Sequence, residues 1–433
     1  MNIFTSKTVS ICTLALITGC SIQTPRTPSA TTTNSLHPFE VYSGGSQQAE
    51  LDMFEKQMNQ VASVQTQLQK NHTLKEKSRV FHEKQHGCLI GSLELLSERP
   101  QDAKHETFEG LFSLQDKKSY TVLARFSNGV GYSQHDLLPD VKGAAIKIFN
   151  VQDSTTDKIK NIDLTMTNSP TAFGKDQAEF IEFMEANINS GFLKNKFAKF
   201  LIDHPAIGRG LIKASLPILS VTQQRYWSGH PYLLKPNLAM KFNIRPLKTD
   251  LNKNIETEEV KNILQAQKKV EESTYKSEAY SLDDQINNLL GLQKYNEKTN
   301  PISEFLKIVH TDYLTKDLAK RASEKEIQFE LSLQIEKSST TTPIEDNLKP
   351  WKEEDSPSIP VGIITFHKQN IDTQEMNSLC QNTRFTPGHF VSQHRPLSNM
   401  GRGRIYTYQR SQEGRKANAT DITEEDVLKL INK

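Results

Sequence analysis

This chain of 433 residues has little of several features that would assign it quickly to a class of protein. Its four cysteines include no Cys-x-x-Cys pair, which excludes a disulfide-dense scaffold and a cysteine-rich metal site. Its 53 basic residues nearly balance 51 acidic ones, and because no basic stripe stands out, we expect no nucleic-acid partner. Beyond the N-terminal leader, no apolar run approaches the roughly 18 residues that cross a bilayer. The 36% of hydrophobic residues is enough to bury a sizeable core.

The N-terminal leader resembles a bacterial lipoprotein signal peptide. One cation, Lys7, precedes an apolar run over residues 9–17, which is too short to span a membrane. Residues 16–20 read Leu-Ile-Thr-Gly-Cys and resemble a lipobox, in which a peptidase cuts before the cysteine that then carries the lipid. The alternative is an ordinary secretory signal with an incidental cysteine. We expect removal of residues 1–19, lipidation at Cys20 and, because Ser21 follows, an outer-membrane anchor facing the periplasm.

Residues 20–47 are predicted to form a flexible stalk, since a segment rich in Ser, Thr, Pro and Gln cannot bury enough apolar surface to order itself. Residues 48–433 then form the folded domain. Once Cys12 leaves with the signal and Cys20 is acylated, Cys88 and Cys380 remain. An oxidising periplasm permits a disulfide between them, but the sequence leaves open whether they meet.

The folded part alternates between helical and strand-like patterns. Residues 51–69 place apolar side chains three or four apart, which predicts an amphipathic helix, and residues 178–203 repeat that pattern. Charged helices are expected over 256–272, 282–292 and 423–431. Short β-rich segments bounded by turn residues predict strands over 120–126, 144–149, 238–244, 327–335 and 361–367. Strands interrupted by helices without regular alternation indicate an α+β domain with a mostly antiparallel sheet.

Five separated pieces of sequence carry the side chains that can do chemistry. Residues 79–84 read Arg-Val-Phe-His-Glu-Lys, 124–127 Ala-Arg-Phe-Ser, 140–147 Asp-Val-Lys-Gly-Ala-Ala-Ile-Lys and 163–173 Asp-Leu-Thr-Met-Thr-Asn-Ser-Pro-Thr-Ala-Phe. The fifth piece spaces Arg404, Tyr408 and Arg415 as Arg-xxx-Tyr-xxxxxx-Arg. In this order they resemble the haem catalase superfamily, and the shorter catalase-like proteins more than the long typical catalases. The resemblance implies a catalase-like antiparallel eight-stranded β-barrel with surrounding helices, and haem b between the barrel and the helix that carries the tyrosine.

On one side of the haem, the resemblance implies that Tyr408 is the axial iron ligand. A phenol must lose its proton to bind iron, and Arg404, four residues before it on a helix, lies on the same face and favours the anion. Tyr406 is the competitor, with Arg402 four residues before it, but Glu413 stands seven residues after it where the second arginine belongs.

The two haem propionates need cationic partners, for which a guanidinium is well matched. The resemblance assigns this role to Arg79, Arg125 and Arg415, with Arg404 also among the cofactor-binding residues.

On the other side of the haem, the resemblance implies that His82 moves a proton between the oxygens of a hydroperoxide, which suits an imidazole. Ser127 would orient the ring, and Asn168 would donate from its amide to the peroxide. The family pattern Asn-Asn-Thr-Pro is one residue shorter here, so Thr167 is the alternative to Asn168 at that position. A second distal base at His86 is a less favoured interpretation.

We therefore predict a haem-dependent hydroperoxide-metabolising enzyme, a catalase or peroxidase tethered at the cell envelope. Phe81 beside the distal histidine, where typical catalases carry valine, changes the space in which a peroxide can lie. Two alternatives remain: conversion of lipid hydroperoxides of the allene oxide synthase type, and a haem-binding envelope protein without turnover. The sequence leaves open whether the substrate is hydrogen peroxide or an organic hydroperoxide. It also leaves open the electron donor and the oligomeric state.

Overall fold

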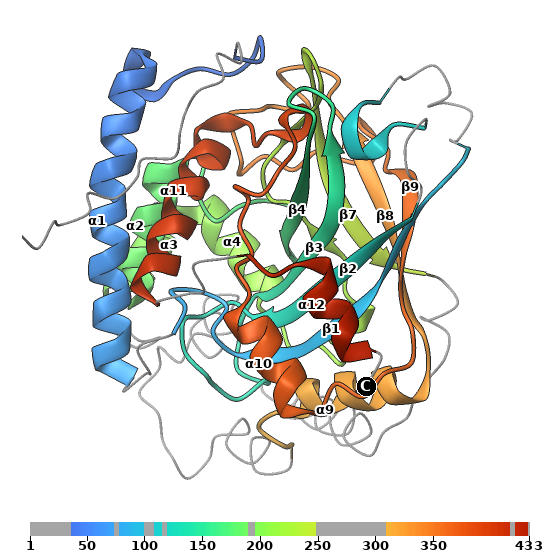
Figure 1. The fold of residues 1–433 in the computed structure, drawn as a ribbon. Coiled ribbons are helices and arrows are strands. Elements are labelled where there is room, and N and C mark those ends of the chain that lie inside the picture. The colour runs from blue at the N-terminus through green and yellow to red at the C-terminus, as the bar shows by residue number, and fades with distance from the viewer. Residues whose placement is uncertain are drawn as a thin grey trace, which may run out of the picture. The chain divides into compact units, whose positions relative to one another are not determined.

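The computed structural model describes residues 36–72, 78–98, 108–114, 119–188, 195–247, 309–415 and 421–431. Its centre is a closed barrel of antiparallel strands (Figure 1). The strands are β1 (Gln85–Leu95), β2 (Ser119–Asn128), β3 (Lys142–Asp153), β4 (Lys158–Thr167), β5 (Tyr226–Trp227), β6 (Tyr232–Lys235), β7 (Leu238–Pro246), β8 (Ile327–Ile335) and β9 (Ile359–Phe366).

The short strand β5 closes the barrel. Trp227 pairs with Thr167 of β4 on one side and with Asn243 of β7 on the other, while β1 pairs with both β2 and β9. Eight strands thus form a ring, to which β6 adds a hairpin on β7. The predicted α+β fold with an eight-stranded antiparallel barrel is confirmed, as are the predicted strands over 120–126, 144–149, 238–244, 327–335 and 361–367.

The barrel interior is filled by large apolar side chains that successive strands supply from alternate positions. Phe126 of β2 packs against Tyr226 and Phe329, with ring centroids 5.8 Å and 6.0 Å away. All three side chains are fully buried. Because the interior is packed, any ligand has to lie outside the barrel, between the strands and the helices that cover them.

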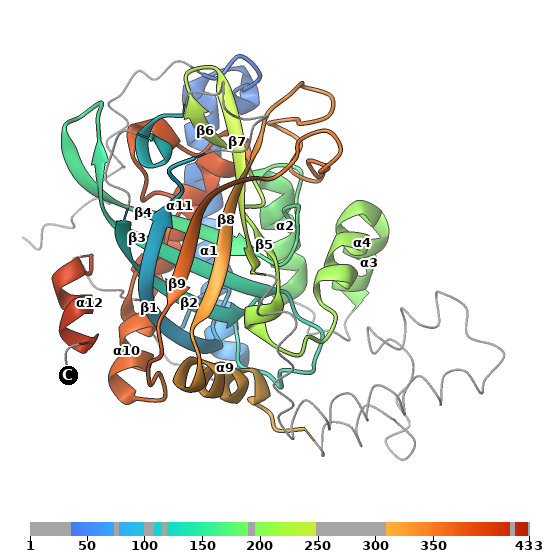
Figure 2. The ribbon, with the colours of Figure 1, turned by 90° about the vertical axis from the view of Figure 1, so that its right-hand side faces the viewer.

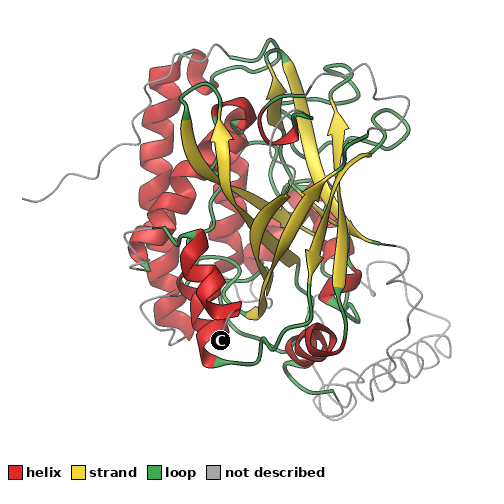
Figure 3. Ribbon diagram, turned by 45° about the vertical axis from the view of Figure 1, so that its right-hand side comes forward, coloured by secondary structure: helices red, strands yellow, loops and turns green. Residues whose placement is uncertain are grey.

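The described helices are α1 (Gln47–His72), α2 (Gln177–Ile188), α3 (Asn195–Asp203), α4 (Pro205–Ala214), α9 (Tyr313–Glu324), α10 (Gln374–Asn382), α11 (Ser398–Gly414) and α12 (Glu424–Ile431). Helices α1, α2 and α11 lie side by side along one side of the barrel (Figures 1 and 3). Helices α3 and α4 continue this layer, as Figure 2 shows. Of the described helices, none has the length and apolarity needed to cross a membrane. The helices predicted over 256–272 and 282–292 lie outside the described residues.

The segment just before α1 is packed against the tyrosine-bearing helix α11. The Glu40 carboxylate is fully buried and accepts hydrogen bonds from Arg395 and Arg402, and Arg402 Nε lies 2.7 Å from Glu50. Residues from His37 onward therefore belong to the folded unit. The prediction of a flexible stalk up to residue 47 is wrong for residues 37–46. Glu40 in this segment binds arginines more than three hundred residues away, which composition cannot reveal.

Cys88 of β1 and Cys380 of α10 form a disulfide, with Cα atoms 5.7 Å apart. This pairing settles the question that the sequence left open.

Candidate functional site

One cavity between the barrel and the helices collects almost every side chain that the sequence singled out. The residues come from the loop before β1, from β2 and from α11, which are far apart in the chain. The predicted residues that line the cavity are Arg79, His82, Arg125, Ser127, Thr167, Arg404, Tyr408 and Arg415.

Tyr408 and Arg404 lie one turn apart on α11 and face this cavity together. Arg404 Nη2 donates to Tyr408 Oη at 2.8 Å and lies 3.4 Å from Thr165 Oγ1. Burial opposes the charge of Arg404, but the neighbouring phenol groups of Tyr408 and Tyr232 outweigh it and raise the pKa of Arg404. The guanidinium therefore stays charged and stabilises negative charge on the Tyr408 oxygen.

The competing pair Arg402 and Tyr406 faces the other way. The Tyr406 ring packs on Phe54 of α1, with centroids 5.2 Å apart, and Arg402 is engaged by Glu40 and Glu50. Residues two positions apart on a helix point to nearly opposite sides, so only one of the two overlapping pairs can face the cavity.

The hydrogen bonds of His82 define its tautomer. Its Nδ1 lies 2.8 Å from the main-chain oxygen of Asn128 and 3.2 Å from Ser127 Oγ. A carbonyl oxygen can only accept, so Nδ1 must carry the proton and Nε2 is left with a free lone pair. Burial, assisted by the charge of Arg125, lowers the pKa of His82 to about 3, so the ring is neutral. His82 thus lines the cavity as a neutral imidazole whose Nε2 carries no proton.

The backbone of His82 is held in a left-handed conformation, with φ of 60°, which costs about 1–2 kcal/mol for a non-glycine residue. Two hydrogen bonds hold this conformation. The His82 N–H donates to the Gly129 main-chain oxygen at 2.8 Å, and Arg125 Nη2 donates to the His82 main-chain oxygen at 2.8 Å. Gly143 of β3 leaves room for the ring, since a Cβ there would lie 2.5 Å from His82 Nδ1. Gly143, which belongs to the third of the five sequence pieces, is therefore part of the site.

The structure corrects the assignment of the distal amide. Asn168 Oδ1 accepts from the main-chain N–H of Lys142 and Nδ2 donates to the Ala214 oxygen, both at 2.8 Å, and Asn168 does not line the cavity. Thr167, the last residue of β4, lines it instead. Adjacent residues of an extended chain point to opposite sides, so the choice between them was a question of register.

His86 is not a second distal base. Its ring is fully buried outside the cavity, and Nε2 lies 2.8 Å from Asn128 Oδ1. Burial lowers its pKa to about 3, which makes it a neutral side chain in the packing beneath the site.

Three guanidiniums gather at one end of the cavity. Among the described residues, no carboxylate lies within ion-pair distance of Arg79, Arg125 or Arg415, and their hydrogen bonds go to main-chain oxygens and, for Arg125 Nε, to Gln85 Oε1. Burial lowers the pKa of Arg125 to about 9 and of Arg415 to about 10, and shifts that of Arg79 down as well. Arg79 Nη1 is buried and has no hydrogen-bond partner among the residues that the structure describes. This end of the cavity therefore fits an anionic group.

The opposite part of the cavity is apolar. Phe81 beside the distal histidine packs near Phe180 and Phe183, with ring centroids 5.9 Å and 6.4 Å away, and Phe173 and Phe197 extend the group. All five rings line the cavity. The apolar face of residues 178–203 is thus a wall of the cavity. A periodic apolar pattern predicts a buried helix face, but it cannot tell whether that face packs in the core or lines a site.

A haem group fits this arrangement. It offers two carboxylates for the arginine end, iron for the Tyr408 oxygen, and a flat apolar ring for other apolar side chains of the lining, such as Ala144 and Met400. Tyr408, whose oxygen accepts from Arg404 in this cavity, is the candidate iron ligand.

The closed barrel with its surrounding helices is a catalase-like fold. Comparison with protein-family models and with curated proteins gives no match. Among solved structures, a fungal catalase matches with a TM-score of 0.53 and 17% identity, over 79% of this chain and 60% of that one. A bacterial catalase (TM-score 0.53, 18% identity, 78% and 57%) and catalase A from Saccharomyces cerevisiae (0.53, 16%, 78% and 61%) match similarly. The chain spans about three fifths of these catalases, and at this identity the likeness establishes the fold.

We expect the His82 ring to stay neutral with its proton on Nδ1 as the pH falls from about 8 to about 4, because burial holds its pKa near 3. Histidine-selective ¹⁵N NMR of the haem-free protein, with His82→Gln to assign the signal, measures both properties. His389 is the internal control: although burial disfavours its charge, the carboxylates of Asp163 and Asp421 raise its pKa above 6.5. A His82 signal that titrates near 6.5, or a proton on Nε2, would contradict the assignment.

Proposed function

We propose that this protein is a haem-dependent enzyme that acts on hydroperoxides at the bacterial cell envelope. The observation that carries the proposal is one cavity in which the Arg404–Tyr408 pair, the neutral imidazole of His82 and the guanidiniums of Arg79, Arg125 and Arg415 meet. The catalase-like fold supports it, since the named neighbours are catalases.

Haem b would be held by residues of three kinds. Tyr408 would ligate the iron as a tyrosinate, with Arg404 at 2.8 Å stabilising the anion. Arg79, Arg125 and Arg415 would bind the propionates, and the buried Nη1 of Arg79 would gain the partner that it lacks. When bound, haem supplies the iron that takes up the oxidising equivalents of the peroxide.

The chain's own contribution to the chemistry is proton transfer and positioning. His82 Nε2 accepts a proton from the hydroperoxide, and Asn128 and Ser127 keep Nδ1 protonated and the ring fixed while it does so. With Asn168 engaged elsewhere, the hydroxyl of Thr167 is the polar group that the end of β4 offers to a substrate.

The apolar wall favours a second candidate, in which the substrate is an organic hydroperoxide that the enzyme rearranges or reduces. Phe81, next to the distal histidine, and the four phenylalanines grouped with it all line the cavity. An alkyl chain would bury apolar surface there, whereas hydrogen peroxide would gain nothing from it.

We further propose that a lipid at Cys20 anchors the protein in the outer membrane, facing the periplasm. The Cys88–Cys380 disulfide agrees with this location, because such bonds persist in oxidising compartments.

The Tyr408→Phe substitution should abolish the tyrosinate-to-iron charge-transfer bands of the haem-loaded protein, because phenylalanine has no oxygen for the iron. Tyr406→Phe, on the outer face of the same helix, is the matched control and should leave the spectrum unchanged.

His82→Ala should keep the haem and slow peroxide consumption by roughly 10²–10⁴-fold. An unchanged spectrum for Tyr408→Phe, or a wild-type protein that takes up no haem, would refute the proposal.

Two substrates separate the two candidate functions. Release of oxygen from hydrogen peroxide without a donor supports a catalase, and consumption of a fatty-acid hydroperoxide without oxygen release supports the second candidate. If the apolar wall binds substrate, Phe81→Leu should lower the rate ratio of organic to inorganic peroxide by roughly tenfold. Phe54→Leu, which lies outside the cavity, should not change that ratio.

The Cys20→Ala substitution should move the protein from the membrane fraction to the soluble fraction, because acyl chains are its only proposed tether. Cys12→Ala alters a cysteine of the leader and should leave it membrane-bound. Membrane attachment of Cys20→Ala would rule out the lipid anchor.

A further inference from the structure

The C-terminal turn of α10 presents its main-chain oxygens to two of the cavity arginines. Arg79 Nη2 donates to the oxygens of Cys380 and Thr383, both at 3.2 Å. Arg415 donates to the Gln381 oxygen at 3.0 Å and to the Thr383 oxygen at 3.2 Å. The last carbonyls of a helix have no partner within the helix and carry partial negative charge, so this turn compensates both guanidiniums.

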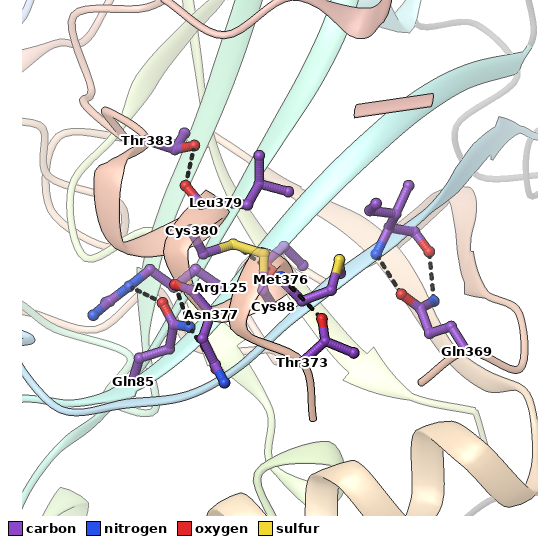
Figure 4. Close-up of a disulfide and its surroundings, with 12 residues drawn as sticks. Gln85, Cys88, Arg125, Gln369, Thr373, Met376, Asn377, Leu379, Cys380 and Thr383 are labelled. Carbon is purple, nitrogen blue, oxygen red and sulfur yellow. Dashed lines mark hydrogen bonds between the residues drawn. A yellow bond between two sulfur atoms is a disulfide. The ribbon is translucent and has the colours of Figure 1, made fainter. Parts of the chain in front are cut away.

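The third arginine, Arg125, is held from the neighbouring strands. It lies directly opposite Cys88 in the β1–β2 register, and its Nε donates to Gln85 Oε1 at 3.1 Å. The Gln85 side chain reaches α10 in turn, with Nε2 3.4 Å from both oxygens of Asn377 (Figure 4). At 3.4 Å these last contacts are long for hydrogen bonds, so they fix the helix only weakly.

The disulfide joins these two supports directly. Cys380 belongs to the turn that accepts hydrogen bonds from Arg79 and Arg415. Its partner Cys88 lies on the strand beside Arg125 (Figure 4). The two cysteines are 292 residues apart in sequence, and both are fully buried. A covalent bond at this point restricts how far the turn of α10 can move from β1.

We propose that the Cys88–Cys380 disulfide is a positioning element for the arginine end of the cavity. The three guanidiniums repel one another. Burial is the largest cause of the lowered pKa of Arg79, and the charges of Arg125 and Arg415 lower it further. Without the cross-link, this repulsion acts on a turn attached by its hydrogen bonds from Arg79 and Arg415, by the long Gln85 contacts and by packing. Arg79 and Arg415 then move away from Arg125, and the site loses its match to a two-carboxylate ligand. That the ligand is the propionate pair of haem rests on the proposed function.

The test compares the wild-type chain with the Cys88→Ala–Cys380→Ala double variant, both loaded with haem. The measurement is the rate at which each loses haem to an excess of apomyoglobin, repeated with the dimethyl ester of haem, which has no propionate charge. We expect the double variant to lose haem roughly tenfold faster, the effect of weakened hydrogen bonds to charged groups, with little change for the ester. The ester-to-haem ratio of the rates therefore falls.

A stability control separates positioning from general destabilisation. Val427→Ala truncates a fully buried side chain on α12, away from the cavity, and lowers stability without touching the arginines. It should leave the ester-to-haem ratio unchanged. A double variant with the wild-type ratio would overturn the proposal.

A second measurement does not depend on haem. Hydrogen exchange in the haem-free chain should be faster in the double variant at residues 379–383, where the Thr383 N–H donates to the Leu379 oxygen at 3.0 Å. Equal protection in both chains would overturn the positioning role. Failure of the wild-type protein to take up haem would refute the proposed function, but it would not affect this hydrogen-exchange test. If the double variant does not fold, wild-type protein reduced with a phosphine takes its place in both measurements.

Discussion

Buried positive charge around one cavity is the constraint on which the rest of the structure depends. Four guanidiniums line this space, and none of them has a carboxylate within ion-pair distance among the described residues. A buried ion without compensation costs several kcal/mol, and besides the nearby charge of Glu83 the fold supplies dipoles. It does so with main-chain oxygens, from His82 and Glu83 for Arg125 and from the end of α10 for Arg79 and Arg415. These dipoles leave the net charge of the cavity positive, which is a condition that an anionic ligand would relieve.

Helix α11 connects this charge to the outside of the molecule. Its inner face carries Arg404 and Tyr408, while Arg402 on its outer face is clamped by the carboxylates of Glu40 and Glu50. Removing one partner of such a buried ion pair is strongly destabilising, by about 3–5 kcal/mol, so the segment before α1 is a structural part of the tyrosine helix. The chain that would lead to a lipid anchor therefore reaches the folded domain directly behind the candidate iron ligand.

The parts of the site that the sequence predicted are those that depend on local relations. The spacing of Arg404 and Tyr408 is a relation within one helix, and strand alternation is a relation within a few residues, so both could be read from the chain. Whether Thr167 or Asn168 faces the cavity depends on register, which a one-residue gap in the resemblance could not settle. The contact between Glu40 and Arg402 and the Cys88–Cys380 disulfide join segments about three hundred residues apart, and only the tertiary structure reveals them.

The two ends of the cavity are mechanically coupled through Arg125. Its Nη2 holds the main-chain oxygen of His82, whose left-handed conformation needs such support, and its charge also acts on Arg79. An anion bound among the arginines would interact with Arg125, the same guanidinium that holds the His82 main chain. Gly143 adds a steric limit, because the imidazole has no room to shift toward β3 once a side chain stands there. The ligand binding proposed for the arginines and the proton transfer proposed for His82 would thus both depend on the contact between Arg125 and the His82 main chain.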